Sequence, residues 1–298
     1  MQNVLITSGL TKIYRGVPVV NGVNMTIKQG DIYGFIGKNG SGKTTFMRTI
    51  LGMTVQERGS YQFFDGVPVE EARKMVGSLI EYPALYKNET VYENMKRFSI
   101  LFGSNSEQEI FELLGFVGLL EAKKMKAKNL SLGMKQRLGI AIALIGNPSF
   151  LVLDEPINGL DPAGIKEIRD VILRLNKELN ITFLISSHLL DELSKIATRF
   201  GLIDRGVLVE EFTAEELNRI NNTRLELVVS DIDRALKLLN ERIPANEIYV
   251  NEGKIILPNF SSQSGAINRY LVENGVDIFE MARPRESLEQ HFIERVGR

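Results

Sequence analysis

Short apolar runs alternate with longer amphipathic stretches through the first two-thirds of the chain. Short, predominantly apolar runs of four or five residues predict buried strands at residues 32–36, 150–153 and 181–185. The stretches that follow predict helices, among them residues 44–51 and 163–179. Strands that alternate with helices in this way are typical of an α/β domain with a parallel sheet.

The first 27 residues follow a different pattern. Residues 4–27 alternate between apolar and polar positions and carry glycines suited to turns at Gly16 and Gly22. A further strand is predicted at residues 59–64, followed by a turn at Asp65-Gly66. We therefore expect a short antiparallel β subdomain beside the α/β core.

A helical insertion is predicted within the core, over residues 84–146. Thr90 is suited to be an N-cap, and Glu93 three residues later completes a capping box. The helices predicted in this insertion span residues 91–101, 107–114 and a stretch from Ser131 to about residue 145. Their presence makes this segment a helical subdomain inserted into an α/β pattern.

The last quarter of the chain predicts a small α+β module. A helix over residues 214–220 ends at Asn221-Asn222, which divides the chain into a domain of residues 1–220 and one of residues 222–298. The predicted strands and helices of the second domain occur in the order β-α-β-β-α-β, followed by a final helix. That order is the one found in ferredoxin-like modules. We recognise no catalytic cluster in this tail.

Composition limits the classes of function. The 298 residues are 44% hydrophobic and 24% charged, as in ordinary globular proteins. The formal net charge of −1 argues against a protein that binds nucleic acid over its whole surface. The absence of cysteine excludes disulfides, thiol catalysis and cysteine metal sites.

The N-terminal residues lack the pattern of a signal peptide. The longest apolar run, near residues 138–146, is shorter than the ~20 residues of a membrane helix. If the protein works at a membrane, we expect another chain to span it.

The strand at residues 32–36 leads into the stretch with the clearest chemistry. Gly37-Lys38-Asn39-Gly40-Ser41-Gly42-Lys43-Thr44-Thr45 fits the pattern G-x-x-x-x-G-K-[ST] of a phosphate-binding P-loop. Glycines let the backbone approach phosphate oxygens, and loop amides and the helix N-terminus direct partial positive charge at the anion. A glycine-rich turn with a chance Gly-Lys-Thr is the alternative, and the strand–loop–helix context argues against it.

Two later strands also end in polar side chains. The strand at residues 150–153 ends in Asp154-Glu155, and the strand at residues 181–185 leads to His188. Ligands of open α/β sheets gather at the carboxyl ends of the strands. Adjacent acids can be a solvated turn, and a lone histidine is more often structural. After a P-loop in the same domain, the two acids favour a role with Mg²⁺ and water. The place of His188 at the carboxyl end of a strand, on the same sheet edge as Asp154, favours a functional role for it as well.

Two other residues remain open on spacing alone. Tyr14, before the turn at Gly16, is either a half-buried strand aromatic or a platform on which a purine ring stacks. Ser131 can cap the helix that follows it, which leaves the first amides of that helix available for an anion. Most segments like the one at Ser131 are ordinary helix starts. On spacing alone, neither Tyr14 nor Ser131 identifies a binding site.

Together these residues resemble the ATP-binding subunit of ABC transporters, over roughly residues 4–211. Five motifs occur in the family's order and spacing. They are residues 37–45 (Walker A), Leu130-Ser131-Leu132-Gly133-Met134 (signature), Leu151-Val152-Leu153-Asp154-Glu155 (Walker B), Asn158-Gly159-Leu160-Asp161 (D-loop) and His188 (switch histidine). Tyr14 also matches the aromatic residue that stacks on adenine in this family.

The chain departs from the family pattern in two places. The family signature has glycine where this chain has Leu132 and glutamine where it has Met134. The family usually has glutamine nine residues before the Thr-Val that opens the next helix, and here that residue is Glu81. A glutamate at this place resembles the subfamily that exports lantibiotics and bacitracin-like peptides. The tail also resembles the C-terminal extension of many exporter-type ATPases.

The resemblance implies transport-coupled hydrolysis of ATP with Mg²⁺ as cofactor. The residues it assigns to ATP are Tyr14, Gly37, Asn39, Gly40, Ser41, Gly42, Lys43, Thr44 and Thr45. It assigns Mg²⁺ to Thr44, Asp154 and Glu81. We expect the fold to be a P-loop ABC-type ATPase core with an antiparallel β subdomain, a helical insertion and the small α+β module.

The resemblance also implies catalytic roles and partners. Glu155 would polarise the attacking water, His188 would contact the γ-phosphate, and Lys43 and Glu81 complete the catalytic set. Ser131 and Gly133 would act in trans, in a homodimer that sandwiches two ATP molecules, and Asp161 would belong to the D-loop. The expected partners are a second copy and an integral-membrane permease, with the chain peripheral at the cytoplasmic face of the membrane.

Three other classes of function share part of this pattern. A soluble ABC-type ATPase acting on DNA or ribosomes usually carries long coiled coils or two ATPase domains, and neither is predicted here. A GTPase or a small-molecule kinase would use the same P-loop. A GTPase should also offer an N-K-x-D motif, and the nearest string, Asn176-Lys177-Glu178-Leu179, lacks the aspartate and lies on a predicted helix. An importer ATPase shares every motif, and Glu81 and the tail favour export over import.

Overall fold

The chain divides into two compact units. The computed structural model describes residues 2–104, 106–217 and 225–282. One unit extends to Phe212 and the other begins at Thr213. The boundary predicted at Asn221-Asn222 and the final helix predicted near the C-terminus lie outside the described residues.

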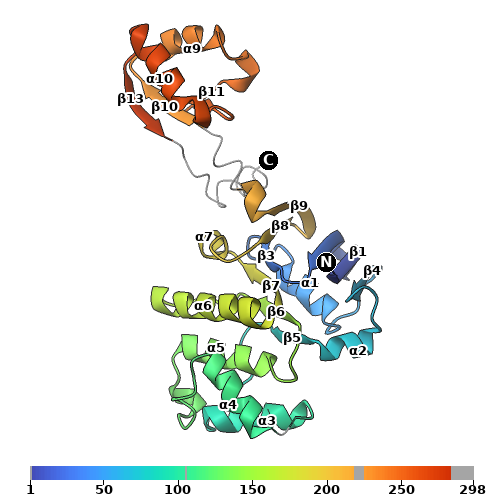
Figure 1. Cartoon of the computed structure of the whole chain (residues 1–298). Coiled ribbons are helices and arrows are strands. Elements are labelled where there is room, and N and C mark those ends of the chain that lie inside the picture. Colours follow the sequence, from blue (N-terminus) through green and yellow to red (C-terminus); the bar gives the residue numbers. More distant parts are fainter. Residues whose placement is uncertain (1, 105, 218–224, 283–298) are drawn as a thin grey trace. The chain divides into compact units, whose positions relative to one another are not determined.

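The larger unit is built on a six-stranded sheet (Figure 1). In sheet order its strands are β5 (Val76–Leu79), β6 (Phe150–Asp154), β7 (Thr182–Ser187), β3 (Ile32–Ile36), β8 (Arg199–Asp204) and β9 (Val207–Thr213). The pairs from β5 to β8 are parallel. Every residue of β3, β6 and β7 is buried, which is why these strands were visible in the sequence as short apolar runs.

A three-stranded antiparallel sheet packs on the same core. Its strands, in order, are β2 (Val17–Lys28), β1 (Asn3–Tyr14) and β4 (Arg58–Phe63). Helix α1 (Lys43–Ile50) lies between the two sheets, because Phe46 and Met47 share one apolar cluster with residues of both. The P-loop helix is therefore held by packing on two sides.

The prediction of a turn at Gly22 is wrong. β1 and β2 each run for 12 residues and turn once, at Arg15-Gly16. Gly22 lies inside β2 with φ at 65°, and its N–H donates to the Thr11 hydroxyl (3.0 Å) rather than to the strand ladder. The register of the two strands shifts beside it, between Leu10 and Lys12. A glycine with positive φ makes a bulge as readily as a turn, so the strands continue through it.

Besides α1, the helices of the larger unit follow the predicted pattern with two short helices and one 3₁₀ turn added. They are α2 (Val69–Lys74), α3 (Val91–Leu101), α4 (Glu107–Phe116), the 3₁₀ turn η1 (Ala127–Asn129), α5 (Leu132–Ala143), α6 (Pro162–Leu179) and α7 (Leu190–Leu193). Helices α2 and α7 were not predicted, because they are only six and four residues long, and α2 buries only Ala72. The capping box is confirmed: the Thr90 hydroxyl accepts from the Glu93 N–H (3.1 Å), and the Thr90 N–H donates to the Glu93 carboxylate (2.7 Å).

The smaller unit has the predicted order β-α-β-β-α-β. Its elements are β10 (Leu225–Val229), α9 (Ile232–Asn240), η2 (Ala245–Glu247), β11 (Tyr249–Asn251), β12 (Lys254–Leu257), η3 (Ser261–Gln263), α10 (Ser264–Glu273) and β13 (Ile278–Ala282). The strands pair antiparallel in the order β11-β12-β10-β13. Both helices contribute to one core with the sheet, since Leu239 and Leu271 lie in the same apolar cluster as Leu227.

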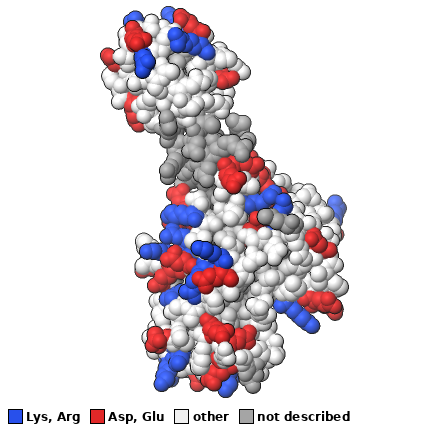
Figure 2. Space-filling view, viewed as in Figure 1, with Lys and Arg blue, Asp and Glu red and all other residues white. Residues whose placement is uncertain are grey.

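Charges of both signs are mixed over the surface of the larger unit. Figure 2 shows Lys and Arg side chains lying beside Asp and Glu side chains on the visible face of that unit. On this face the described residues form no single broad basic area, in keeping with the formal net charge of −1.

Candidate active site

Three neighbouring strands of the six-stranded sheet bring the predicted residues together. β6, β7 and β3 are adjacent and parallel, so their carboxyl ends meet at one edge. Asp154 pairs in register with Ser186, and Ile36 with Ser187. The P-loop after β3, the acids after β6 and His188 after β7 therefore lie at the same edge of the sheet.

The P-loop needs its glycines for space as well as for conformation. A Cβ on Gly37 would collide with the carbonyl oxygen of Ile203, and one on Gly42 would collide with the carbonyl oxygen of Val19. Gly42 has φ at 109°, in the region that favours glycine, and stands as the N-cap of α1. Because a glycine cap has no side chain, the first amides of α1 are available to an anion.

The remaining residues of the loop are spread from exposed to buried. Asn39 and Gly40 are exposed, and Gly40 has φ at 80°. Ser41 is buried, and within the described part of the chain its hydroxyl has no hydrogen-bond partner. Thr45 lies in the first turn of α1, where its carbonyl accepts from the Thr49 hydroxyl (2.7 Å).

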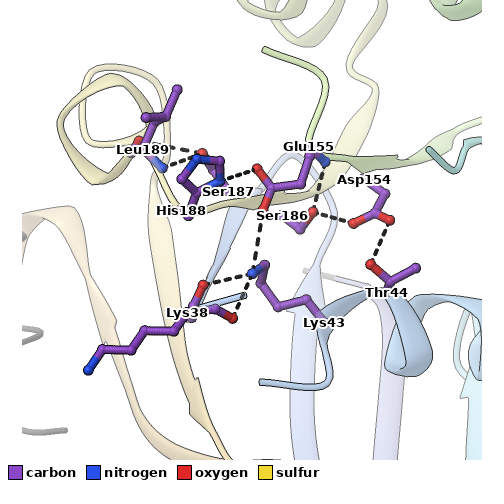
Figure 3. A network of polar contacts seen from close by, with 10 residues as sticks. Lys38, Lys43, Thr44, Asp154, Glu155, Ser186, Ser187, His188 and Leu189 are labelled. Carbon is purple, nitrogen blue, oxygen red and sulfur yellow. Dashed lines mark hydrogen bonds and ion pairs between the residues drawn. The ribbon is translucent and has the colours of Figure 1, made fainter. Parts of the chain in front are cut away.

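The ammonium group of Lys43 is buried at the centre of the site (Figure 3). Only 6% of the residue is exposed. Its Nζ donates to the carbonyl oxygens of Gly37 (2.7 Å) and Lys38 (3.3 Å) and lies 3.4 Å from Oε1 of Glu155. These oxygens hold the charge of Lys43 over the loop, where the phosphates of a nucleotide would lie.

Thr44 and Asp154 are joined directly. The Thr44 hydroxyl donates to Oδ2 of Asp154 (2.8 Å), and the Ser186 hydroxyl donates to Oδ1 (2.6 Å). Ser186 in turn accepts from the backbone N–H of Glu155 (2.8 Å). The carboxylate of Asp154, which is 3% exposed, is thus oriented on both sides, so its position relative to Thr44 is fixed.

Glu155 stands between a lysine and a histidine. Oε2 of Glu155 lies 2.8 Å from Nδ1 of His188, and Oε1 faces Lys43. An ionised carboxylate only accepts, so Nδ1 of His188 carries the proton of this bond. The Ser187 hydroxyl accepts from the Leu189 N–H (2.9 Å), which fixes the turn that carries the histidine. The backbone of Glu155 has φ at 49°, a costly conformation that clusters at functional sites.

A cavity of about 180 Å³ opens beside these groups. It is lined by Thr44, Glu81, Tyr82, Gln136, Asp154, Glu155 and Asn158. Glu81 has φ at 62°, and its Oε1 accepts from Arg48 of α1 (2.7 Å). Carboxylate, hydroxyl and amide oxygens are the donors that Mg²⁺ prefers, so these residues fit the ion. Among the described residues, no group of three or more His, Cys, Asp or Glu is arranged to hold a metal alone.

Four residues of the site were not predicted from the sequence. The Ser186 hydroxyl donates to Asp154 and accepts from the backbone N–H of Glu155, and Arg48 pairs with Glu81. Tyr82 and buried Gln136 line the cavity, and the amide oxygen of Gln136 has no hydrogen-bond partner in the described part of the chain. Arg48 follows Thr44 by four residues, which places both on one face of α1. That spacing is the one sequence signal that would have pointed to Arg48.

The signature residues lie at a second cavity, of about 410 Å³. It is lined by Ser131, Leu132, Gly133, Met134, Arg137, Gly159, Leu160, Asp161, Ala163, Gly164 and Glu167. Ser131 caps α5 by accepting from the Met134 N–H (3.2 Å), and Asp161 caps α6 by accepting from the Gly164 N–H (2.9 Å). Neither cavity shares a lining residue with the other. Within one chain, the fold therefore does not bring Ser131, Gly133 and Asp161 into the cavity beside Lys43.

Tyr14 lies at the hairpin end that approaches the P-loop. It pairs with Val17, two residues before Val19, whose carbonyl oxygen packs against Gly42. The same carbonyl packs against Gly206 in the turn after β8, and the Gly206 N–H donates to the Ser41 carbonyl (2.9 Å). Tyr14 is 44% exposed, as a side chain available to a ligand should be.

Comparison with known proteins agrees with this geometry. Residues 20–158 match the ABC transporter family. The chain is 39% identical to the bacitracin transport ATP-binding protein BcrA of Bacillus licheniformis, over 100% of this chain and 98% of that protein. It is 42% identical to the lantibiotic transport ATP-binding protein SrtF of Streptococcus pyogenes, over 72% of this chain and 95% of that protein. The ADP conformation of the ATP-binding cassette MJ1267 matches with a TM-score of 0.67 and 26% identity, over 74% of this chain and 95% of that one.

The fold and site are those of an ABC-type nucleotide-binding ATPase. The chain belongs to the family of ABC transporter ATP-binding subunits, and it is an ATPase that powers transport. In the part of the chain that the structure describes, no helix has the length and apolar character needed to cross a membrane.

Proposed function

We propose that the chain drives the export of a peptide antibiotic through a separate membrane permease, and so protects the cell. The full-length similarity to a bacitracin transport protein carries this proposal, because it includes the smaller unit as well as the ATPase unit. The similarity to a lantibiotic transport protein supports the same class of cargo. Glu81 at the edge of the cavity, in place of the family's usual glutamine, agrees with both.

In this proposal Mg²⁺ is held by Thr44 and Asp154, with Glu81 as a further oxygen ligand. Asp154 already has its carboxylate oriented by Thr44 and Ser186, so its position costs little further ordering when the ion arrives. When bound, Mg²⁺ would neutralise negative charge on the phosphates of ATP. The chain would work at the cytoplasmic face of the membrane, beside its permease.

Lys43 and Glu155 then exchange partners as ATP binds. Lys43 gives up part of its contact with Glu155 to bind phosphate oxygens, together with the amides of the P-loop. Glu155, released on that side, keeps its bond to His188 and is free to orient and polarise the attacking water. His188 contacts the γ-phosphate through Nε2, the ring nitrogen that is not bonded to Glu155.

The second cavity supplies the other half of the site from a partner chain. Ser131 and Gly133 line a cavity separate from the one beside Lys43, so one chain cannot offer both to the same ATP. In a homodimer each ATP would lie between the P-loop of one chain and the signature helix of the other, with Asp161 at the junction. ATP would then hold the dimer together until it is hydrolysed.

The variant Glu155→Gln tests this function. Removing the carboxylate should slow ATP hydrolysis by orders of magnitude while leaving ATP binding intact. A dimer should then accumulate with ATP and Mg²⁺, measured by size-exclusion chromatography, and the parent chain should return to monomer as it hydrolyses ATP. In cells that also carry the permease, the parent should confer resistance to bacitracin-like or lantibiotic peptides, and the variant should not.

Two results would contradict the proposal. If the Glu155→Gln variant stays monomeric with saturating ATP, both alone and in the presence of its permease, the ATP-sandwiched dimer is ruled out. If cells that carry the parent chain and its permease remain fully sensitive to the peptides, the proposal of peptide export is wrong. That result would not contradict the ATPase activity.

A further inference from the structure

One face of the Tyr14 ring is covered by a charged side chain. Lys12 lies two residues earlier on β1, on the same side of the strand. Its Nζ is 4.9 Å from the centroid of the Tyr14 ring, within the range of a cation–π contact. Nothing in the assigned mechanism uses Lys12.

The ammonium group of Lys12 is held in place by hydrogen bonds to Val55 and Glu57. Lys12 is 9% exposed, and its Nζ donates to the Val55 carbonyl (2.7 Å) and to Oε1 of Glu57 (2.8 Å). Oε2 of Glu57 accepts from the Ile13 N–H (2.7 Å), and the Glu57 N–H donates to the Thr11 carbonyl (2.9 Å). The hydrogen bond from Lys12, with that from Ile13, keeps the pKa of the Glu57 carboxyl below its usual value. The ammonium group is thus fixed between β1 and the segment that precedes β4.

The uncovered part of the Tyr14 ring is where a ligand can reach it. The side chain remains 44% exposed although Lys12 covers one face. Tyr14 pairs with Val17, and Val19, about 7 Å further along the strand, packs against Gly42 of the P-loop. The exposed ring of Tyr14 therefore lies on the hairpin that contacts the P-loop, where a nucleotide with its phosphates in that loop can place its base.

We propose that Lys12 is a positioning residue for the base of ATP. It covers one face of Tyr14 and holds the ring still, so that adenine stacks on the opposite face of a ring that is already ordered. Ordering a side chain before the ligand binds lowers the entropy cost of binding. This inference rests on the proposed function, in which ATP is the ligand, and on the expectation from the sequence that Tyr14 stacks on adenine.

Titration calorimetry on the full chain separates the base from the phosphates. ATP and inorganic tripolyphosphate are each titrated in EDTA, which prevents hydrolysis, against the parent and the variants Lys12→Met, Lys12→Arg and Tyr14→Ala. Lys12→Met should weaken ATP binding by about two- to fivefold, the range of a cation–π contact, and leave tripolyphosphate binding unchanged. Lys12→Arg keeps the cation and should bind ATP like the parent. Adding Lys12→Met to Tyr14→Ala should cause no further loss.

A fluorescence signal provides a second readout. The chain contains no tryptophan, so Tyr14→Trp introduces a single indole whose emission reports on the ring itself. ATP should quench this emission and tripolyphosphate should not, and the quench should require a higher ATP concentration when Lys12 is also changed to Met. The double variant Lys12→Met/Glu57→Gln removes both charges together, so a loss of ATP affinity there cannot come from an unpaired Glu57.

The outcomes distinguish the inference from the function on which it rests. If Tyr14→Ala weakens ATP binding and neither Lys12→Met nor Lys12→Met/Glu57→Gln does, Lys12 has no positioning role. The stacking of adenine on Tyr14 would still stand. Equal losses of ATP and tripolyphosphate affinity would show a general distortion, and would also overturn the role of Lys12. If Tyr14→Ala binds ATP as the parent does, the stack itself is wrong.

Discussion

Glu81 and Glu155 are two acidic residues with left-handed backbones at the same cavity. Their φ angles are 62° and 49°, and such conformations cost roughly 1–3 kcal/mol each in residues other than glycine. Both carboxylates are held by a cation, Glu81 by Arg48 and Glu155 by Lys43. The two acids are therefore placed at some cost in stability, as expected where their position serves binding or catalysis.

Changing Glu81 should affect transport more than hydrolysis. A carboxylate strengthens the contact with Mg²⁺ but repels the γ-phosphate, so Glu81→Gln should keep the ATPase rate within about tenfold, or ~1.4 kcal/mol of barrier. Glu81→Ala should lose more, since it removes the oxygen altogether. Both should reduce peptide resistance in cells more than they reduce the ATPase rate. Arg48→Gln is the matched control for the ion pair, because an exposed pair contributes little to stability and the variant should fold normally. Full resistance with Glu81→Ala would show that this carboxylate is incidental.

Most residues beside Lys43 could be predicted because they belong to contiguous motifs at strand ends. Lys43, Asp154 and His188 each follow a buried apolar run, and parallel strands bring such positions to one edge. Ser186 and Arg48 could not be predicted in the same way. Their roles depend on hydrogen bonds between separate strands and helices, and neither residue type is unusual at the end of a strand or on a helix surface.

At the level of helices and strands, hydrogen bonds between residues close in the sequence determine where some of them begin. Contacts with residues far away in the sequence determine others. Helix α3 begins where the capping box of Thr90 and Glu93 places it, because both bonds form within four residues. The bulge at Gly22 depends instead on a bond to Thr11 on the partner strand, and α2 depends on packing of Ala72. A sequence shows the first kind of signal and not the second.

The capping box gives a prediction for the stability of α3. Thr90→Ala should lower the free energy of unfolding by about 1 kcal/mol, and Thr90→Ser, which keeps the hydroxyl, should stay close to the parent. Calorimetry of the full chain measures both. An equal loss in the serine variant would show that the methyl group, not the cap, stabilises the helix.

The same box gives a pH dependence. Hydrogen bonds from the Thr90 backbone and hydroxyl keep the pKa of the Glu93 carboxyl below its usual value. A lowered pKa in the folded state stabilises the fold above the unfolded pKa, near pH 4.3, and that contribution is lost as pH falls through the lowered value. The stability difference between the parent and Glu93→Gln should therefore shrink in acid.

At the scale of the whole molecule, the two units have separate cores. The apolar cluster of the smaller unit consists of residues from 225 to 276, with further residues of the same unit packed on it. None of these residues lies at either cavity of the larger unit. We propose that the ATPase domain of residues 1–220 does not need the domain of residues 222–298 for catalysis.

A chain ending at residue 220 tests this division. It should fold, bind ATP and hydrolyse it, because every residue assigned to ATP and Mg²⁺ lies before residue 189. Peptide resistance in cells should fall, since the full-length relatives carry the second unit. Calorimetry and ATPase rates measure the first expectation. A truncated chain that is soluble and folded but does not bind ATP would show that the tail contributes to the site.

The carbonyl oxygen of Val19 packs against Gly42 of the P-loop and against Gly206 of the turn after β8. Three segments far apart in the sequence meet there through backbone atoms, and the Gly206 N–H bonded to Ser41 closes the junction. A contact made by a carbonyl is indifferent to the side chain of the residue that carries it. A substitution of the half-buried side chain at position 19 should therefore leave this junction in place. The two glycines have no such freedom, because a methyl group on either would push the hairpin off the loop.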